Sequence, residues 1–356
     1  MTEREQRKDE HIEAVKKLPD PGTAGFDDLV LLPAVASEIE ASEVSLSTRL
    51  MGRTLKSPII INAMTGGTAR AARINEVLAV FASQHGLAMA VGSETAGLQA
   101  NSPQAQSFRI VRDANPHGVV IANVGMGAEP DLAQRAVDLV SADFLQIHWN
   151  TAQELFMTEG DRDFRYFLER LAAAAGRVTV PIIAKEVGQG MTGPAARRFI
   201  EHGAAAVDIG GRGGTNFIAV EAWRAGRAAE DEWLDWGLTT PVSLLEVRSS
   251  ISRQIPVVAC GGIRSGHDIA KCLAAGAQAV GIAGPLLRLA DAGDHDQLDQ
   301  WLAAIHDSLR KVMILTGAPT IAALGQRPLV VRGAALEWMS VRGLMDYVYE
   351  LGRRDQ

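Results

Sequence analysis

The feature that most constrains the fold of this sequence is a unit repeated eight times between residues 56 and 285. Each unit is a short, continuously apolar run that ends in small or polar residues. Such runs are typical of parallel strands that are buried on both faces. The predicted strands span residues 58–64, 87–93, 119–125, 142–148, 181–188, 205–211, 256–262 and 279–285.

Helical patterns fill most segments between these runs. They predict helices over residues 71–85, 130–140, 164–175, 193–202, 242–252 and 265–275. Glycines suited to helix C-caps follow four of them, at Gly86, Gly176, Gly203 and Gly276. Eight such units predict an α/β fold of the TIM (β/α)8 barrel class, with a doubly wound sheet as the alternative. We expect an N-terminal arm and linker over 1–55, the barrel over 56–356, and an extended loop after strand six within 212–254.

Polar residues stand just after several of the predicted strands. They are Thr65, Ser93, Asn123, His148 and Lys185. The strands of a TIM barrel all end at one rim, and the active sites of these barrels lie there. We therefore expect residues that are scattered along the sequence to converge on one site.

The stretch 146–163, QIHWNTAQELFMTEGDRD, is the most polar part of this predicted rim. His148, Asn150, Gln153 and Glu154 offer an imidazole, two amides and a carboxylate. That set suits an anionic ligand accompanied by a hard cation. A polar loop that caps the following helix is the alternative interpretation.

Two glycine-rich segments, CGGIRSG at 260–266 and GIAGP at 281–285, follow predicted strands seven and eight. Loops in these two places commonly bind phosphate, because glycine lets backbone N–H groups approach the anion. Arg264 could add a charge-assisted bond, and Thr215 in a third flexible loop, 210–216, could reach a ligand phosphate or ring. The phosphate could belong to FMN, to PLP or to a sugar-phosphate substrate, and simple turn glycines are the alternative.

Lys185 allows three interpretations: a Schiff-base lysine, an ion pair with Glu186, or a cation at the edge of a flavin ring. The neutral polar groups of Thr65, Ser93 and Asn123 suit a flavin better than PLP, which needs an acid for its pyridine nitrogen. The residues therefore favour FMN.

Composition excludes several classes of function. Lys plus Arg number 35 and Asp plus Glu 42, for a net charge of -7 in 356 residues, so a basic nucleic-acid-binding surface is not expected. Two cysteines fit a reducing cytoplasm. The charged N-terminus has no signal-like apolar core, and no apolar run approaches the roughly 18 residues that suggest a membrane span. We expect a cytoplasmic protein without membrane insertion.

Residues 1–25 are polar and end in prolines and glycines, which predicts a short helix or mobile arm followed by a linker. If this segment is helical, Arg7 and His11 share a face. An ordinary solvated tail is the alternative.

Several longer motifs resemble those of the type 2 isopentenyl-diphosphate isomerases, which are FMN-dependent. The resemblance covers nearly the whole chain. It rests on RKDEH (7–11), INAMTGGT (61–68), QIHWNTAQELFMTEGDRDF (146–164), KEVGQGM (185–191), GGRGGTNF (210–217), WGLTTPVSLLE (236–246) and CGGIRSGHDIAK (260–271).

The resemblance implies an isomerase that interconverts isopentenyl and dimethylallyl diphosphate in isoprenoid biosynthesis. It implies FMN, reduced by NADPH, together with Mg²⁺, and a homo-oligomer of four or eight chains. The implied FMN contacts are Ala63, Met64, Thr65, Ser93, Asn123, Lys185, Thr215, Gly261, Gly262, Ile263, Arg264, Ala283 and Gly284. The implied substrate contacts are Arg7, Lys8, His11, Ser93, His148, Asn150 and Gln153, and Glu154 is the implied Mg²⁺ ligand.

No pair of acids on the predicted rim is placed for the two proton transfers that this reaction needs. We expect Gln153 and His148 to be catalytic. Our hypothesis is that reduced FMN carries the proton through N5 or N1 and that Gln153 orients or relays it.

The sequence departs from its relatives at Glu94-Thr95, where many have a basic residue that helps to hold the diphosphate. Thr158 occupies a position where this family often has proline, and Gln189 one where it often has phenylalanine. We expect both replacements to be tolerated.

Three other functions were considered. A hydroxyacid oxidase on the same barrel would need a histidine base with paired arginines. His202 does not suit this role, because it precedes strand six and so lies on the wrong side of the barrel. An IMP-dehydrogenase-like enzyme would need a nucleophilic cysteine in 210–216, which has none, and Cys260 suits a packed thiol. A non-enzymatic flavin- or phosphate-binding protein would not depend on Mg²⁺.

Overall fold

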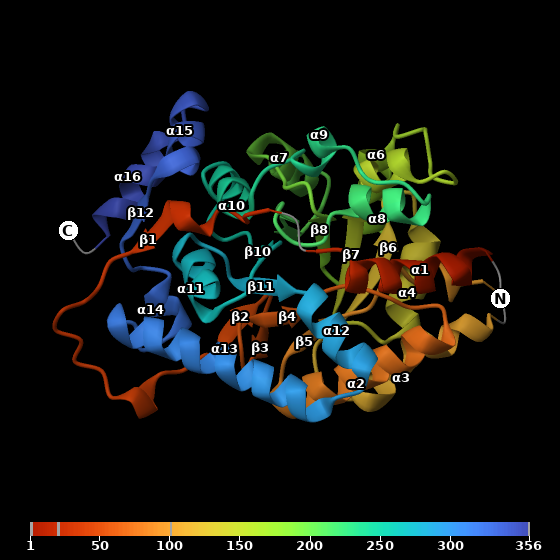
Figure 1. Cartoon of the computed structure of the whole chain (residues 1–356), viewed down its shortest axis with the longest axis horizontal. Helices are drawn as coiled ribbons and strands as arrows, with labels where there is room; N and C mark the ends of the chain where they lie inside the picture. The colour runs from red at the N-terminus through yellow and green to blue at the C-terminus, as the bar shows by residue number, and fades with distance from the viewer. Residues whose placement is uncertain (1–2, 20–21, 100–101, 355–356) are drawn as a thin grey trace.

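The computed structural model describes residues 3–19, 22–99 and 102–354, and its centre is a closed barrel of eight parallel strands (Figure 1). All eight predicted strands are confirmed. Each pairs with the next in sequence, and β11 pairs with β4 to close the barrel. The strands are β4 (Ile59–Ile61), β5 (Ala88–Ala90), β6 (Val120–Gly125), β7 (Phe144–Trp149), β8 (Ile182–Glu186), β9 (Ala206–Asp208), β10 (Val257–Cys260) and β11 (Ala279–Ile282).

The predicted helices also form, and others join them around the barrel. Side chains of Thr68, Thr192 and Ser265 cap α2, α7 and α11 by accepting backbone N–H groups, which explains where these helices begin. The helices are α2 (Ala69–His85), α3 (Gln106–Ala114), α4 (Pro130–Leu139), α5 (Thr151–Phe156), α6 (Phe167–Ala175), α7 (Gly193–Glu201), α10 (Thr240–Arg248), α11 (Gly266–Ala274), α12 (Gly284–Ala292) and α13 (His295–Leu315).

The predicted C-cap glycines behave in two ways. Gly86 ends α2 in the left-handed conformation, and Gly203 and Gly276 adopt it one residue beyond the caps of α7 and α11. Gly176 ends α6 in the right-handed conformation, because α6 closes with ordinary i→i+4 bonding. Gly176 is nevertheless the C-cap of α6, so its predicted position is confirmed.

The interior of the barrel is filled by side chains in layers of four from alternate strands. Ile60, Ile121, Ile183 and Val258 form one layer, and Ala88, Phe144, Ala206 and Ala279 form the next. This arrangement is typical of TIM barrels. Successive residues of a strand point to opposite faces, so the next inward positions, two residues further on, are polar. They include Asn62, Asn123, Gln146, Lys185 and Asp208.

Two small sheets lie outside the barrel ring. Strands β2 (Thr48–Leu50) and β3 (Arg53–Leu55) pair with each other, and their Leu50 and Leu55 join the inner apolar cluster of the barrel. Strand β1 (Leu29–Leu31) pairs with β12 (Leu329–Val331), so the N-terminal segment is joined to the C-terminal part of the chain. The domain boundary at residue 55 stays a prediction.

The remaining elements are short or lie near the chain ends. They are the 3-10 turns η1 (Phe26–Asp28), η2 (Ala41–Glu43), η3 (Glu94–Ala96) and η4 (Pro103–Ala105), and the helices α14 (Ile321–Leu324), α15 (Gly333–Val341) and α16 (Met345–Arg353).

Residues Glu3–Lys17 form helix α1, which lies beside α8 (Phe217–Arg224) in Figure 1. Ile12 and Ala14 are buried, so this helix is packed on the barrel and is not a solvated tail. The segment after β9 contains α8 and α9 (Asp231–Leu234). Helices therefore occupy much of the stretch that was expected to be an extended loop.

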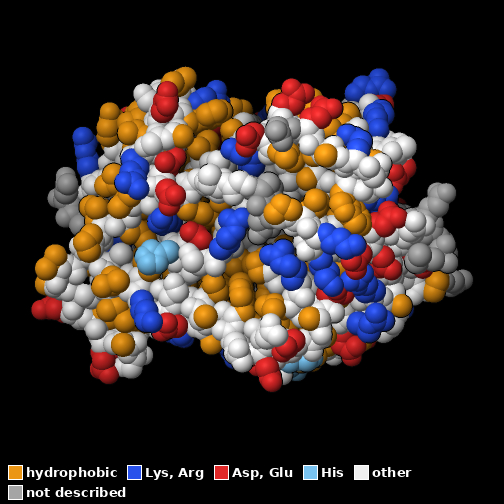
Figure 2. Space-filling model, in the orientation of Figure 1, with side chains coloured by type: hydrophobic (Ala, Val, Ile, Leu, Met, Phe, Trp, Pro, Cys, Tyr) orange, Lys and Arg blue, Asp and Glu red, His pale blue; other side chains and the backbone are white. Residues whose placement is uncertain are grey.

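Within the described ranges, no helix is long and apolar enough to cross a membrane. Both cysteines are buried and free. On the face shown in Figure 2, basic and acidic side chains are intermixed, as the small net charge leads one to expect.

Candidate active site

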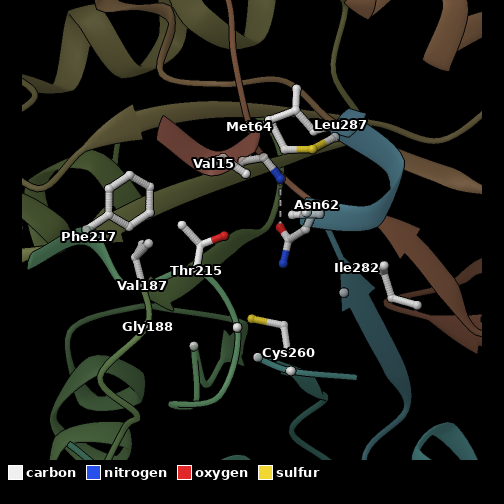
Figure 3. A pocket seen from close by; sticks show the side chains of 18 of the residues that line it. Val15, Asn62, Met64, Val187, Gly188, Thr215, Phe217, Cys260, Ile282 and Leu287 are labelled. Carbon is white, nitrogen blue, oxygen red and sulfur yellow. Dashed lines mark hydrogen bonds between the residues drawn. The ribbon is translucent and has the colours of Figure 1, made fainter. Parts of the chain in front are cut away.

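A pocket lined largely by glycines opens at the C-terminal rim of the barrel, and we call it the glycine-lined pocket. Its space amounts to about 1110 Å³ when the open solvent at its mouth is included. Thr215, Asn62 and Cys260, from three separate segments, lie around the same space in Figure 3. All predicted FMN residues except Ser93 and Asn123 line it: Ala63, Met64, Thr65, Lys185, Thr215, Gly261, Gly262, Ile263, Arg264, Ala283 and Gly284.

The backbone at the end of β10 forms a cradle that only glycine permits. Gly261 has φ +112° and Gly262 φ +65°. A Cβ at Gly261 would clash with the carbonyl of Gly211, and one at Gly262 with the carbonyl of Gly213. Across the pocket, α12 begins at Gly284 with its backbone N–H groups unpaired within the helix, an arrangement that attracts anions.

Two further observations fit FMN in this pocket. The Thr65 hydroxyl is buried and has no hydrogen-bond partner among the described residues. A Cβ added at Gly284 would be in ordinary van der Waals contact with Arg288 Nη1 at 3.7 Å and Thr215 Oγ1 at 3.9 Å, so a guanidinium and a hydroxyl lie close to the start of α12. Arg264 lines the same pocket and donates to the carbonyls of Gly262 and Gly213, which holds the cradle in shape.

Lys185 lies on the wall of this pocket and is buried. Its Nζ contacts Asp208 Oδ2 at 2.9 Å and Cys260 Sγ at 3.3 Å. Burial lowers the pKa of Lys185, but the charges of Asp208 and Cys260 and the hydrogen bonds to them together outweigh burial and raise it. The ammonium form is therefore strongly favoured, which argues against a Schiff-base lysine.

The predicted ion pair between Lys185 and Glu186 is wrong, because the carboxylate of Glu186 accepts the backbone N–H groups of Gln189 and Gly190 instead. Burial raises the pKa of Glu186 to about 8. Cys260 donates to Asp208 Oδ1 at 2.8 Å, and burial together with that carboxylate raises the thiol pKa to about 12. Cys260 is thus an inert thiol, as expected.

A second, more polar pocket adjoins the first, and we call it the polar pocket. Lys8, His11, Ala63, Met64, Lys185, Val187 and Phe217 line both. Every predicted substrate residue lines the polar pocket, as do Asn123 and Glu154. These residues are Arg7, Lys8, His11, Ser93, His148, Asn150 and Gln153.

His148 is held by a 2.8 Å hydrogen bond between its Nδ1 and Asn123 Oδ1. Burial, with the charges of Lys8 and Lys185, lowers its pKa to about 4. The imidazole is therefore neutral near pH 7.

Asn150 is the N-cap of α5, so the capping interpretation of this stretch holds for that residue. Its Oδ1 accepts the backbone N–H of Gln153, and its Nδ2 donates to Gln153 Oε1 at 2.7 Å. The cap thereby orients the Gln153 side chain toward the pocket that both residues line.

Glu221 of α8 is a central contact that the sequence did not reveal. It is 2 % exposed. Its Oε1 accepts from Gln153 Nε2 at 2.7 Å and lies 2.9 Å from His11 Nε2, while Oε2 pairs with Arg224. Arg224 also reaches Glu10 and thereby fastens α1. The sequence feature that could have pointed to Glu221 is an acidic residue on a mainly apolar helix.

Other contacts hold α1 from the opposite side. Lys16 pairs with Asp291 of α12, and Arg70 bridges Asp291 and Glu13. Asp9 accepts from the hydroxyl of Thr68. Helix α1 is thus fixed over both pockets by side chains from α2, α8 and α12.

Glu154 is the only carboxylate that was predicted to bind metal. It accepts the backbone N–H of Asp161, and burial raises its pKa. In the described part of the chain, no three His, Cys, Asp or Glu side chains cluster as a metal site. A magnesium ion here would need most of its oxygen ligands from substrate phosphates and water, which Mg²⁺ tolerates.

The departure at Glu94-Thr95 has a clear geometry. Glu94 is buried and accepts the backbone N–H of Asn123 at 2.9 Å, so it turns away from the pocket. Thr95 lines the polar pocket and lies 3.2 Å from Ser93 through their hydroxyls. Neither Glu94 nor Thr95 supplies the positive charge that many relatives have at this position.

Comparisons with known proteins agree with this geometry. A family model described as FMN-dependent dehydrogenase matches residues 129–331. The chain is 42% identical over 353 residues to an isopentenyl-diphosphate delta-isomerase from Symbiobacterium thermophilum, covering 97% of both chains. It is 41% identical to the protein of that name from Moorella thermoacetica, covering 96% of this chain and 99% of the other.

Solved structures share the fold at low identity. A lactate oxidase from Pediococcus acidilactici superposes with a TM-score of 0.65 at 16% identity, covering 92% of this chain and 94% of the other. A mandelate oxidase variant gives 0.63 at 17%, covering 92% and 99%. His202 and Arg212 line neither pocket, and Arg212 pairs with Asp235.

Proposed function

The chain belongs to the family of FMN-dependent isopentenyl-diphosphate delta-isomerases, and we propose that its glycine-lined pocket holds FMN while the polar pocket holds the isoprenoid diphosphate. The reaction is the interconversion of isopentenyl and dimethylallyl diphosphate. The observation that carries the proposal is the wall shared by the two pockets, which includes Met64, Lys185 and Val187. Because these residues line both pockets, the pockets are adjacent, and ligands bound in them would lie next to each other.

The FMN phosphate would bind the N–H groups of the cradle at Gly261-Gly262 and the N-terminus of α12, with Thr215 beside it. Lys185 would place a positive charge at the ring edge. A cation there stabilises a reduced, anionic flavin, and the reduced flavin would supply proton-transferring atoms next to the substrate. Ser93 and Asn123 would reach the ring from the polar pocket.

The diphosphate would meet cations and hydrogen-bond donors that α1 and α5 bring to the polar pocket. Arg7 and Lys8 supply positive charge, and His11, Asn150 and Ser93 supply polar contacts. Glu154 would hold Mg²⁺ against the diphosphate oxygens. Local cations are needed because the chain as a whole is acidic.

Gln153 and His148 are our candidates for handling protons at the alkene. An amide is too weak a base to act alone, so Gln153 would orient the substrate or relay a proton. Glu221 holds the Gln153 amide nitrogen at 2.7 Å, which keeps its carbonyl oxygen toward Asn150 Nδ2. This support gives the amide one orientation in the pocket.

We further propose reduction by NADPH, a homo-oligomer of four or eight chains, and a cytoplasmic location. The division into an arm (1–55) and an FMN-binding barrel (56–356) belongs to the same proposal.

An anaerobic assay tests it. Purified protein is mixed with isopentenyl diphosphate, FMN and Mg²⁺, with and without NADPH, and dimethylallyl diphosphate is quantified. We expect product only when the flavin is reduced and Mg²⁺ is present. Product formed equally well with oxidised flavin or with EDTA would overturn the proposed cofactor set. If FMN is tightly bound and fully reduced but no product forms, the result would indicate that the protein acts on another substrate.

A further inference from the structure

Below the two pockets, the inward-facing polar residues of the barrel form a connected series of hydrogen bonds. The series runs from Asp208 on β9 through Asn62, Gln146 and Asn123 to His148 on β7. Asp208 and Gln146 line neither pocket and are fully buried. They therefore act on a ligand only through their neighbours.

The Asp208 end of this series has a fixed polarity. Oδ2 of Asp208 receives Lys185 Nζ at 2.9 Å and Asn62 Nδ2 at 2.8 Å, and Gln146 Nε2 lies 3.4 Å away. An ionised carboxylate only accepts hydrogen bonds. Asn62 must therefore turn its amide nitrogen, and not its oxygen, toward Asp208.

This polarity passes along the amides one by one. With its nitrogen on Asp208, Asn62 turns Oδ1 to Gln146 Nε2 at 3.2 Å. The Oε1 of Gln146 then faces Asn123 Nδ2 at 3.1 Å. Asn123 is left with Oδ1 toward His148 Nδ1 at 2.8 Å. Flipping any one amide would set two donors or two acceptors against each other in a buried place, where an unsatisfied polar group is strongly disfavoured.

The last bond decides which nitrogen of His148 carries the proton. An amide oxygen can only accept, so Nδ1 must be the protonated nitrogen of the neutral ring. Nε2 is left with a bare lone pair beside Gly125, which lines the polar pocket. His148 would present a donor there, and not an acceptor, if the series ran in the opposite direction.

We propose that Asp208 is a positioning residue that fixes His148 in its Nδ1-protonated form through Asn62, Gln146 and Asn123, so that Nε2 faces the substrate as the proton-accepting nitrogen. Its catalytic consequence rests on the proposed function, which places substrate beside His148. The same carboxylate holds Lys185, so one buried group sets a charge in the glycine-lined pocket and a tautomer in the polar pocket.

The test measures the tautomer directly in ligand-free protein labelled with ¹⁵N-histidine, by NMR at pH 7. The signal of His148 among the eight histidines is identified by its loss in His148→Gln. In the wild type we expect protonated Nδ1 and bare Nε2. In Gln146→Met, which interrupts the series but leaves the Lys185–Asp208 pair in place, the Asn123 amide is free to flip. The Nε2-protonated form should then become comparably populated.

Asp208→Ala should produce the same change by removing the origin of the series. Should that variant fail to fold, Gln146→Met decides alone. The matched control is Cys260→Ala, which removes a different partner of Asp208 and should leave the tautomer unchanged. Wild-type-like Nδ1 protonation in Gln146→Met would overturn the proposal. So would an equal tautomer change in Cys260→Ala, which would indicate general loosening.

Activity gives a second readout. Gln146→Met should lower kcat by about tenfold to 100-fold, as loss of an outer hydrogen-bond partner often does, with a smaller change in KM. An unchanged kcat beside a changed tautomer would overturn the catalytic consequence. The NMR result does not require isomerase activity, so it stands even where the assay of the proposed function fails.

Discussion

The glycine-lined pocket and the polar pocket share lining residues, yet they differ in whether backbone or side chains set their shape. The first includes the backbone at the ends of β10 and β11, and its shape there depends on the missing side chains of Gly261 and Gly262. The second is made of side chains from α1, β7 and α5, held by ion pairs with α8. A motif therefore encodes the first locally, while the second depends on contacts between distant segments.

This difference predicts opposite sensitivities. Adding a methyl group should damage the glycine-lined pocket, which has no room for it. Removing a polar group should damage the polar pocket, where each side chain has a partner. The four predictions below test this contrast, from the largest expected effect to the smallest.

Gly261→Ala should weaken FMN binding by about 100-fold or more. The new Cβ meets the Gly211 carbonyl and φ of +112° is strained, and overpacking and strain each cost about 1–3 kcal/mol. Flavin fluorescence titration measures the affinity. Gly293→Ala is the control, with φ of +70° but no atom within 4 Å of its Cβ. It should cost about 1 kcal/mol of stability and leave FMN binding intact. Equal losses in both variants would contradict the local cradle.

Gln153→Ala should lower kcat by about 100-fold while leaving FMN affinity close to that of the wild type. Removing the amide deletes the contacts to Asn150 and Glu221 without touching the cradle. Steady-state kinetics and flavin titration separate the two effects, with exposed Gln99→Ala as the control. Near-normal turnover would rule out a relay or orienting role.

Thr95→Lys should lower KM for the diphosphate by about fivefold, an effect of about 1 kcal/mol, with little change in kcat. Thr95 lines the polar pocket, so a lysine at this position adds a positive charge to those of Arg7 and Lys8. The comparison is best made at low ionic strength with Thr95→Gln as the uncharged control. An unchanged KM would mean that Arg7 and Lys8 already saturate the diphosphate.

Lys8→Ala should raise the pKa of His148 from its value of about 4 by less than one unit. Burial is the larger cause of the depression, and Lys8 adds to it by repelling the imidazolium. Histidine in an unfolded chain titrates near about 6.5, so the wild type loses stability as pH falls from there toward 4, and the variant should lose less. NMR titration measures the pKa, with Lys17→Ala as the control. A fall in the pKa would contradict this electrostatic role of Lys8.

The same contrast explains what the sequence could reveal. All eight strands and the glycine loops were predicted, because they depend on local apolar runs and on residues adjacent in sequence. Glu221 and Asp208 were missed because their importance comes from partners on other elements, such as Gln153 and Lys185. Asp208 did leave one signal, an acid at an inward position of an otherwise apolar strand.

The position of helix α1 is a second feature that could not be predicted from the sequence. Its composition is polar, so a solvated tail was a reasonable alternative. Three ion-pairing partners on α2, α8 and α12 fix it instead, and none of them can be matched to it from sequence alone.

The pairing of β1 with β12 bears on the order of events during synthesis. These strands lie near opposite ends of the chain, so β1 gains its partner only when translation is almost complete. The barrel strands and the loops after β10 and β11 emerge earlier. The cradle can therefore form while β1 still lacks its partner, so this small sheet joins the two ends of the chain as a late step.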